Sequence, residues 1–385
     1  MKQRIRIGMV GGGPGAWVGR PHRVAMRIDD RYDLVAGAFS RDFEKSKSMG
    51  EELGIDPDRV YPSYKEMAAA EAERGDGIEA VSVVTLHNTH HEIAAAFLDI
   101  GVHVVCEKPV TITLSDALDL QRRAQQGGLV FGVTHNYSGY PMVRQAARMV
   151  RDGVIGEVRV AHAEHAQGSG STARENEGNA HMGWHTDPDI VTTASVVYNL
   201  GTHAHHLLRF VSGLEVNEVS AEMMTHVPGR RVYDDAFANL RLSNGARGTV
   251  WASMVAAGNE HGLRIRVFGE KGSLEWRHED SQHLVLRPAD GPEQLFSPGR
   301  AGLSEDAHRS ARLGRGHSEG FFEAFANLYR EIADAIDARR SGLPAQPSEL
   351  GFPTIRDGVL GVRFVEAVAE SHGKGGAWVD AKVDI

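Results

Sequence analysis

The first third of the chain alternates short apolar runs with helix-like segments, and this alternation constrains the fold more than any other feature. Strands separated by helices in this way form a parallel sheet with right-handed crossovers, covered by helices. The sequence therefore predicts an α/β domain with a doubly wound parallel sheet over residues 1–135. The expected strands are residues 5–10, 32–39, 59–61, 81–84, 103–106 and 129–133.

Residues 136–385 have a different pattern. Here most apolar runs alternate with polar residues and are joined by turn sequences such as Asn244-Gly245. Consecutive strands of this kind predict a C-terminal α+β domain with a large, mostly antiparallel open sheet and helices on one face. The expected elements are strands at 156–164, 216–225, 235–242, 246–255, 263–268, 274–277 and 283–286, helices at 141–151, 194–212, 319–339 and 355–371 (the last a candidate to pack back on the first domain), and loops at 167–188 and 288–316.

The 385-residue chain has a formal net charge of −9, which argues against nucleic-acid binding because that function needs a basic surface. Cys106 is the only cysteine, so an internal disulfide cannot form and a reducing compartment is expected. The first residues lack the apolar stretch of a signal peptide, and no apolar run reaches the ~18 residues of a membrane helix. We expect a cytoplasmic protein that binds neither membranes nor nucleic acid.

A glycine-rich turn, Gly11-Gly12-Gly13-Pro14-Gly15-Ala16, joins the first expected strand to the first helix. Gly11, Gly13 and Ala16 satisfy the dinucleotide-binding fingerprint, in which glycine lets the backbone approach a pyrophosphate and the helix N-terminus supplies free N–H groups. A purely structural turn would also use glycine. The position at the head of a strand–helix series favours a Rossmann domain, and the long spacing makes Gly19 an alternative third glycine.

The second expected strand ends in Ser40-Arg41-Asp42. In Rossmann domains, side chains at this position bind the ribose of the cofactor. Asp42 could accept the ribose hydroxyls of NAD, whereas Ser40 and Arg41 could hold the 2′-phosphate of NADP. Ser40 and Asp42 are also good N-cap residues for the next helix, and Arg41 could simply be solvated. The choice between NAD and NADP therefore stays open at this stage.

The segment Cys106-Glu107-Lys108-Pro109 leaves the strand 103–106 at the sheet edge where ligand crevices lie, and residues 85–90 leave the strand 81–84 at the same edge. In the second domain, Asn199 and His203 are four residues apart on an expected helix and so share a face. The candidate cofactor-binding residues are Gly11, Gly13, Pro14, Gly15, Ala16, Ser40, Arg41, Thr85, His87, His90, Glu107 and Lys108.

Together these features resemble the glucose–fructose oxidoreductase, inositol dehydrogenase and rhizopine-catabolism (Gfo/Idh/MocA) family over nearly the whole chain. Glu-Lys-Pro at 107–109 is the specific part, and the stretches 134–137 and 316–320 are similar to a subgroup near sugar 3-dehydrogenases. The resemblance implies that Lys108 hydrogen-bonds the reacting hydroxyl beside the nicotinamide. It also implies that His203 takes the hydroxyl proton as hydride leaves, and that Pro109 shapes the turn, with a cis bond as one option.

These roles agree with elementary chemistry. An alcohol gives up hydride readily only when its proton is removed in step, and imidazole titrates near the working pH. The family usually has aspartate where Asn199 stands. An amide cannot accept a proton, although it can orient a hydroxyl, so the acid–base role falls on His203 or the reaction changes. Each residue also has a purely structural interpretation. Lys108 could be a solvated charge at the end of a strand, and His203 could be a helix histidine that hydrogen-bonds the backbone.

Other polar and aromatic residues are candidates for a substrate crevice, because hydrogen-bonding groups beside an aromatic wall suit a polyol. Loop anchoring and capping explain them equally well. Short histidine clusters at 162–165, 181–185 and 203–206 are possible ligands of a metal ion. No cysteine accompanies them, and we do not expect a metal site. The candidate catalytic residues are Lys108, His203 and Asn199, and the candidate substrate-binding residues are His135, Tyr137, Trp184, His185, Asn199, His203 and His317.

We therefore predict an NAD(P)-dependent dehydrogenase that acts on a secondary hydroxyl of a sugar, glycoside or cyclitol. Two alternatives keep the fold: redox-assisted glycoside cleavage with tightly bound NAD, and a dinucleotide-sensing protein without catalysis. The outer face of an open sheet needs a cover, so we also predict a homo-oligomer, either a dimer or a tetramer.

Overall fold

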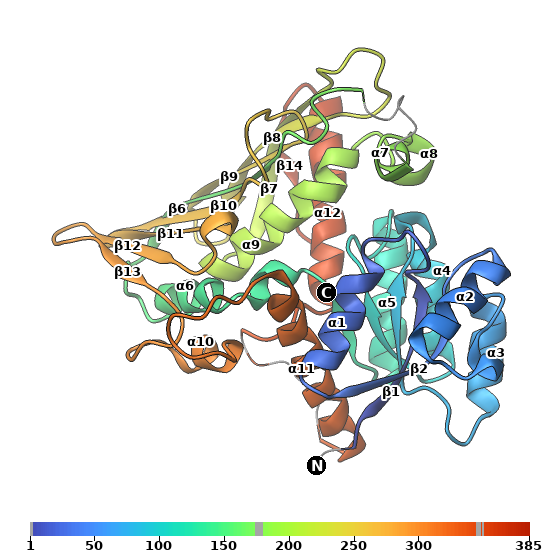
Figure 1. Cartoon of the computed structure of the whole chain (residues 1–385). Helices are drawn as coiled ribbons and strands as arrows, with labels where there is room; N and C mark the ends of the chain where they lie inside the picture. The colour runs from blue at the N-terminus through green and yellow to red at the C-terminus, as the bar shows by residue number, and fades with distance from the viewer. Residues whose placement is uncertain (1–2, 174–179, 344–347, 349) are drawn as a thin grey trace. The chain divides into compact units, whose positions relative to one another are not determined.

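The computed structural model describes residues 3–173, 180–343, 348 and 350–385, apart from the side chains of residues 180–182 (Figure 1). The chain divides into two compact units. The first comprises Met1–Gly139 with Phe321–Val359, and the second comprises Tyr140–Gly320 with Leu360–Ile385. The first unit therefore includes a helix from the C-terminal part of the chain.

The first unit contains a five-stranded parallel sheet in the order β2-β1-β3-β4-β5. Its strands are short apolar runs, and β3 is buried along its whole length, as parallel strands covered on both faces must be. The strands are β1 (Ile5–Gly11), β2 (Tyr32–Ala38), β3 (Ala80–Val84), β4 (His103–Cys106) and β5 (Phe131–Val133).

Helices cover this sheet. The helix α1 (Gly19–Ile28) packs against α11 (Phe321–Arg340), and α4 packs against both α3 and α5. The side chains of Asp42, Ser63 and Thr113 cap the first turns of α2, α3 and α5, which explains where these helices begin. The remaining bounds are α2 (Phe43–Leu53), α3 (Tyr64–Glu73), α4 (His90–Asp99) and α5 (Leu114–Gly127).

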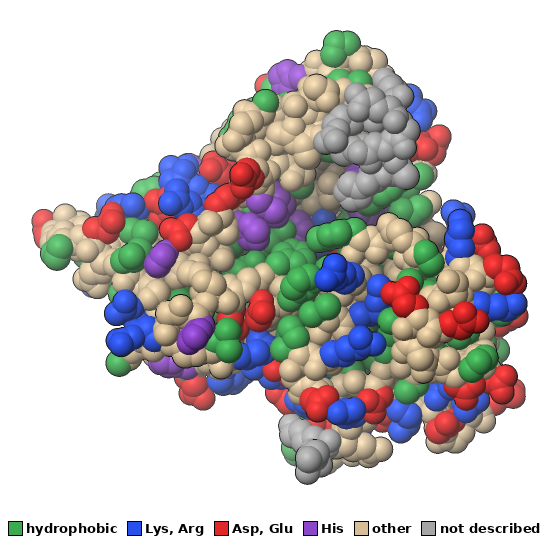
Figure 2. Space-filling model, viewed as in Figure 1, with side chains coloured by type: hydrophobic (Ala, Val, Ile, Leu, Met, Phe, Trp, Pro, Cys, Tyr) green, Lys and Arg blue, Asp and Glu red, His purple; other side chains and the backbone are tan. Residues whose placement is uncertain are grey.

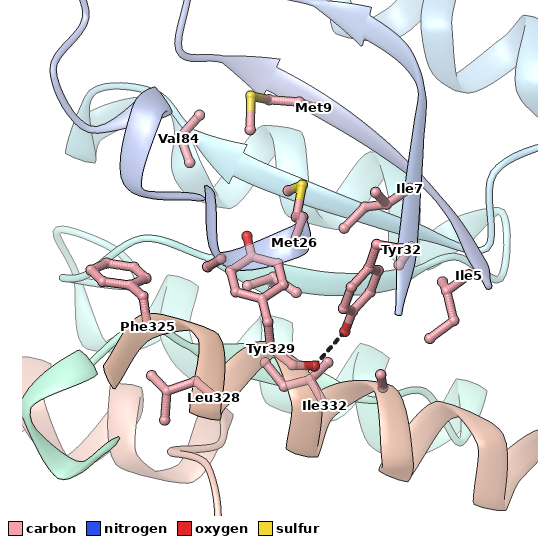
Figure 3. Packing of buried hydrophobic residues seen from close by; sticks show 14 of the residues in the cluster. Ile5, Ile7, Met9, Met26, Tyr32, Val84, Phe325, Leu328, Tyr329 and Ile332 are labelled. Atoms are coloured by element: carbon pink, nitrogen blue, oxygen red, sulfur yellow. Dashed lines mark hydrogen bonds between the residues drawn. The ribbon is translucent and has the colours of Figure 1, made fainter. Parts of the chain in front are cut away.

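The core of the first unit depends on α11, as Figure 3 shows. Apolar side chains of β1, α1 and β2 meet those of α11, and the Tyr32 hydroxyl donates a hydrogen bond to the backbone oxygen of Tyr329 (2.8 Å). The sequence suggested that the last helix packs back on the first domain, and its first residues, 355–359, belong to the first unit. The helix that lies on this core is α11. The cluster includes Ile5, Ile7, Met9, Met26, Phe325, Leu328 and Ile332.

The second unit contains a nine-stranded sheet in the order β13-β12-β11-β10-β6-β9-β8-β7-β14. Neighbouring strands are antiparallel except β6 and β9, which are parallel. The strands are β6 (Val158–Ala166), β7 (Val216–Met224), β8 (Asp235–Leu242), β9 (Arg247–Ser253), β10 (Leu263–Gly269), β11 (Gly272–Arg277), β12 (Leu284–Pro288), β13 (Gln294–Phe296) and β14 (Val379–Asp380).

Helices lie on one face of this sheet. The helix α6 (Pro141–Arg151) packs on β11 and β12, and α9 (Thr202–Ser212) packs on β6, β9 and β10 (Figure 1). The helix α12 (Ile355–Gly373) begins in the first unit and continues in the second from Leu360. The predicted fold class, a doubly wound parallel sheet followed by an α+β domain with a mostly antiparallel open sheet, is confirmed.

Three local predictions were wrong. The strand expected at 59–61 is a 3₁₀ turn, Pro57–Arg59, followed by a single bridge from Val60 to Gly37, because Pro57 and the capping Asp56 start a turn there. The loop 167–188 contains α7 (Ala180–His185), while its residues 174–179 lie outside the described part. The loop 288–316 contains β13 and α10 (Glu305–Ser310). In the described part of the chain, no helix combines the length and apolar character needed to cross a bilayer.

Candidate active site

The glycine-rich turn follows β1 and has a backbone that side chains would block. Gly11 has φ of +86°, and a Cβ there would lie 2.6 Å from the backbone oxygen of Val84. The N–H of Gly13 donates to the backbone oxygen of Phe39 (3.1 Å), which fixes the turn against the end of β2. The turn residues Pro14, Gly15 and Ala16 are exposed, as a pyrophosphate site requires.

The helix after this turn begins at Gly19, three residues beyond Ala16. A Cβ on Gly19 would lie 2.6 Å from the Cα of Gly12, so Gly19, and not Ala16, provides the close packing of helix on strand. Among the described residues, no side chain caps the first turn of α1, so the position that a cap would take is open to an anion.

At the end of β2, the structure supports the capping interpretation of Asp42. Its carboxylate accepts hydrogen bonds from the backbone N–H groups of Glu44 (3.1 Å) and Lys45 (3.4 Å), and the Ser40 hydroxyl accepts one from the N–H of Asp42 (3.1 Å). Arg41 is exposed on the same turn. The one carboxylate of this turn is thus occupied as a helix cap.

The turn after β3 brings Thr85, His87 and His90 to the same sheet edge. The His90 ring is fully buried and bridges two turns, with Nδ1 2.9 Å from the backbone oxygen of Pro109 and Nε2 3.1 Å from that of Thr85. Burial lowers the pKa of His90. A neutral imidazole has one N–H, so His90 donates to one of these oxygens at a time, and both of its nitrogens face backbone oxygens; His87 is buried beside it with ring centroids 5.9 Å apart.

Lys108 follows β4 in a turn with a cis Lys108–Pro109 peptide bond, the option that the resemblance left open. Its side chain is half-buried. Burial lowers the pKa of Lys108 to about 8, and the neighbouring charge of Glu107 acts in the opposite direction. The ammonium form thus predominates at neutral pH, while proton loss becomes accessible within the working range of an enzyme.

Glu107 is buried behind this turn and has partners that the sequence did not reveal. Its Oε1 accepts hydrogen bonds from the Thr134 hydroxyl (2.5 Å) and His22 Nε2 (2.9 Å). His135 and Tyr137 follow closely and are buried, with Tyr137 edge-on to Phe321 of α11. Glu107, His135 and Tyr137 are therefore buried, whereas the neighbouring Lys108 is half-buried.

In the second unit, Asn199 and His203 lie on consecutive helical turns, although the local geometry was not predicted. Asn199 belongs to a π-helical turn, Val197–Gly201, and His203 to the first turn of α9. Such π turns frequently mark functional sites. His203 is buried, whereas Asn199 is partly exposed.

His203 is at one end of a row of four imidazole rings that the sequence did not predict. Its ring centroid lies 5.7 Å from that of His165 on β6, which stacks on His261 (4.6 Å), which stacks on His278 (4.0 Å). Burial decreases along the row, from buried His203 and His165 to partly exposed His261 and His278. Figure 2 shows histidine side chains gathered on this face of the second unit.

The histidine clusters of the sequence meet only in part: His165 and His203 lie next to each other, whereas other members have separate partners. His162 bonds Thr249 (2.5 Å) and packs edge-on against Phe268, while His205 stacks on Phe364 (4.3 Å). The side chain of His181 lies outside the described part. Among the described side chains, no group of three His, Cys, Asp or Glu residues could hold a metal ion.

The other substrate candidates of the second unit lie in two different settings. Trp184 stacks on buried His185 (centroids 3.5 Å apart), and the His185 backbone oxygen accepts a hydrogen bond from Ser195, which precedes the π-helical turn. His317 lies on an exposed loop, where its N–H bonds the backbone oxygen of Gly314 (3.2 Å).

Comparison with known proteins assigns both parts of the chain. The oxidoreductase family with an NAD-binding Rossmann fold matches residues 5–135, and the GFO/IDH/MocA C-terminal domain matches residues 143–275. An uncharacterized oxidoreductase of Bacillus subtilis (strain 168), YfiI, is 36% identical over 381 residues, which cover 98% of this chain and 97% of YfiI.

Solved structures agree. An inositol dehydrogenase homolog from Azotobacter vinelandii, complexed with NAD+, has a TM-score of 0.94 and 39% identity, over 99% of this chain and 98% of that chain. The same homolog complexed with NADH and myo-inositol has a TM-score of 0.92 and 38% identity, with the same coverage. The expectation of an oxidoreductase that uses a nicotinamide dinucleotide is confirmed, and NAD is the cofactor class shown. This chain belongs to the GFO/IDH/MocA family of NAD-binding oxidoreductases.

Proposed function

We propose that the protein is an NAD-dependent dehydrogenase that oxidises a secondary hydroxyl of a cyclitol or pyranose to a ketone, reversibly. The observation that carries this proposal is the half-buried Lys108, set by the cis-Pro turn at the sheet edge that holds the glycine-rich turn. The bound myo-inositol of the Azotobacter neighbour supports the substrate class. The first unit would bind the dinucleotide and the second the polyol.

The proposed reaction uses Lys108 to stabilise the reacting oxygen and His203 to accept its proton. The Lys108 ammonium donates a hydrogen bond to the reacting oxygen and stabilises the negative charge that develops there. His203 accepts the hydroxyl proton as hydride passes from the carbon to the bound nicotinamide, leaving a ketone, reduced cofactor and one extra proton.

Asn199 would position the substrate without exchanging protons. Its amide offers a donor and an acceptor to neighbouring hydroxyls. Because a carboxylate is missing at this position, His203 carries the acid–base role alone. We also assign NAD rather than NADP, supported by the NAD+ in the Azotobacter neighbour, and a cytoplasmic location, supported by the single buried Cys106.

A panel assay tests this function. Inositols, pyranoses and glycosides are supplied with NAD or NADP, and reduced cofactor is followed by absorbance. We expect NADH to accumulate with at least one cyclitol or pyranose, and Lys108→Ala to lose about 10³-fold or more in activity while still binding NAD. Release of an aglycone without net NADH would indicate redox-assisted cleavage, and NAD binding without turnover would indicate a sensor. Either result would overturn the proposal.

We further propose a homodimer or homotetramer in which a second copy covers the outer face of the large sheet. Phe237, 46% exposed, stacks on Trp251 there (5.6 Å), and the Arg241 guanidinium lies 4.2 Å over the exposed Trp378 ring. Exposed aromatic rings of this kind favour association. Light scattering should show that Phe237→Glu lowers the assembly state, while Leu313→Glu on an exposed loop does not. A monomeric parent protein would contradict this.

A further inference from the structure

The turn that carries Lys108 rests on a buried network joining several elements of the first unit. The Glu107 carboxylate accepts hydrogen bonds at Oε1 from Thr134 and from His22 Nε2 (2.9 Å), and at Oε2 from the backbone N–H of Lys108 (3.2 Å). His22 comes from α1, the helix that starts the dinucleotide site, and is fully buried. One imidazole thus connects the cofactor helix to the residue before the lysine.

The far side of the His22 ring has two hydroxyl partners. Nδ1 lies 2.7 Å from Tyr329 Oη and 3.2 Å from Ser82 Oγ, and these hydroxyls lie 2.9 Å apart. Burial raises the pKa of Tyr329, so this residue stays a phenol and can donate to Nδ1. The Glu107 carboxylate can only accept, so His22 Nε2 carries a hydrogen toward it, whether Nδ1 accepts from the Tyr329 hydroxyl or also carries a hydrogen.

This arrangement determines the charge of Glu107. Burial by itself would raise the pKa of Glu107, but the hydrogen bond and the charge of His22, the hydrogen bond from Thr134 and the charge of Lys108 outweigh it, and the pKa is lowered. The ionised carboxylate then raises the pKa of Lys108, against the stronger effect of burial. Loss of the His22 bond would remove part of the support for the carboxylate and, through it, for the ammonium.

We propose that His22 is a positioning residue for Lys108: its Nε2–H keeps the Glu107 carboxylate ionised beneath the cis-Pro turn, and that carboxylate keeps the lysine protonated. The consequence for turnover rests on the proposed function. The charge of Lys108 itself can be measured without any substrate.

Three other titratable groups face this network from neighbouring elements of the first unit. His90 of α4 bonds the Pro109 oxygen, Cys106 ends β4, and Tyr329 comes from α11. Burial lowers the pKa of His90 and raises the pKa values of Cys106 and Tyr329, so all three are neutral near pH 7. The His22–Glu107 pair is therefore the group that adjusts the charge at Lys108.

Two substitutions separate the proposed role from simple packing. His22→Gln places an amide near the Nε2 position and keeps a donor toward Glu107, whereas His22→Asn reaches only as far as Nδ1 and loses it. The readout is the pH dependence of amine labelling by acetic anhydride in cofactor-free protein, measured peptide by peptide, with exposed Lys271 as the internal control. Glu107→Gln gives the full effect of losing the carboxylate.

We expect the labelling midpoint of Lys108 to fall by about 0.5 to 1 pH unit in His22→Asn, by more in Glu107→Gln, and to stay near the parent value in His22→Gln. The descending limb of kcat/KM should follow in the same order. Equal midpoints in all four proteins would overturn the inference, whatever their melting temperatures. Shifted midpoints in a protein that oxidises no sugar would retain the inference and count against the proposed function alone.

Discussion

Gly19 lies so close to Gly12 that a Cβ on Gly19 would be 2.6 Å from both the Cα and the backbone oxygen of Gly12. This approach brings the first turn of α1 against the end of β1, where the glycine-rich turn begins. The dinucleotide site is therefore set by a backbone-to-backbone contact that no side chain can replace.

Gly19→Ala should weaken NAD binding by about 10-fold or more, because the added methyl group pushes the helix N-terminus away from the pyrophosphate position. Gly75→Ala is the matched control, since a Cβ there meets no atom within 4 Å and its φ is not positive. Titration calorimetry with NAD measures both variants. If the dissociation constant for NAD is unchanged in Gly19→Ala, the helix can shift without losing affinity for the cofactor.

The pH dependence of oxidation should report Lys108. Burial lowers the pKa of Lys108 to about 8, and Glu107 partly opposes this effect. Since the protonated lysine is the active form, kcat/KM for myo-inositol, or for the best substrate of the panel, should fall as pH rises through about 8. In Lys108→Arg the residual activity should not fall in this pH range, because a guanidinium keeps its charge throughout. A fall in kcat/KM near pH 8 that persists in Lys108→Arg would come from another titratable group.

The parallel sheet and the Lys108 turn could be predicted because both are local in sequence. Apolar runs at fixed spacing define β1 and β3, and Glu107, Lys108 and Pro109 are adjacent. The Glu107 network could not be predicted, since its members His22, Thr134 and Tyr329 lie far apart in the chain and only the fold brings them together. The same applies to the histidine row, whose rings come from β6, α9, the loop before β10 and the 3₁₀ turn after β11.

Other differences arise from tertiary context. Ala16 fits the fingerprint spacing, but α1 begins later, so the packing role falls to Gly19. His90 has a residue type that suits cofactor contact, yet both of its ring nitrogens face backbone oxygens. Sequence spacing indicates which residues are near the sheet edge, but it does not indicate which of them point outward.

Asn199→Asp tests how far the missing carboxylate shapes the reaction. A charged group about one helical turn from His203 would favour the protonated imidazole, so the ascending limb of the kcat/KM profile should move to higher pH by about 0.5 to 1 unit. Asn199→Ala is the control for loss of the hydrogen bond without added charge, and it should raise KM with little movement of the limb. If the ascending limb of the kcat/KM profile lies at the same pH in the parent and in Asn199→Asp, the base is a residue other than His203.

Stability should depend on a buried ion pair under the first sheet, between Arg59 and Glu71. Arg59 Nε lies 3.0 Å from Glu71 Oε1, which also accepts from the Tyr61 hydroxyl (2.8 Å), while the N–H of Ile78 bonds Oε2 (3.0 Å). Arg59→Met would leave the fully buried Glu71 carboxylate without its countercharge. The expected loss in free energy of unfolding is about 3 to 5 kcal/mol.

The exposed Arg159–Glu270 pair is the matched control: Arg159→Met should cost about 0 to 1 kcal/mol, because water already solvates both charges. Urea denaturation at neutral pH measures all the variants. Arg59→Met combined with Glu71→Gln should recover part of the deficit of Arg59→Met, because the second substitution removes the uncompensated charge. A deficit that Glu71→Gln does not relieve would mean that Arg59 acts through packing of its aliphatic stem rather than through its charge.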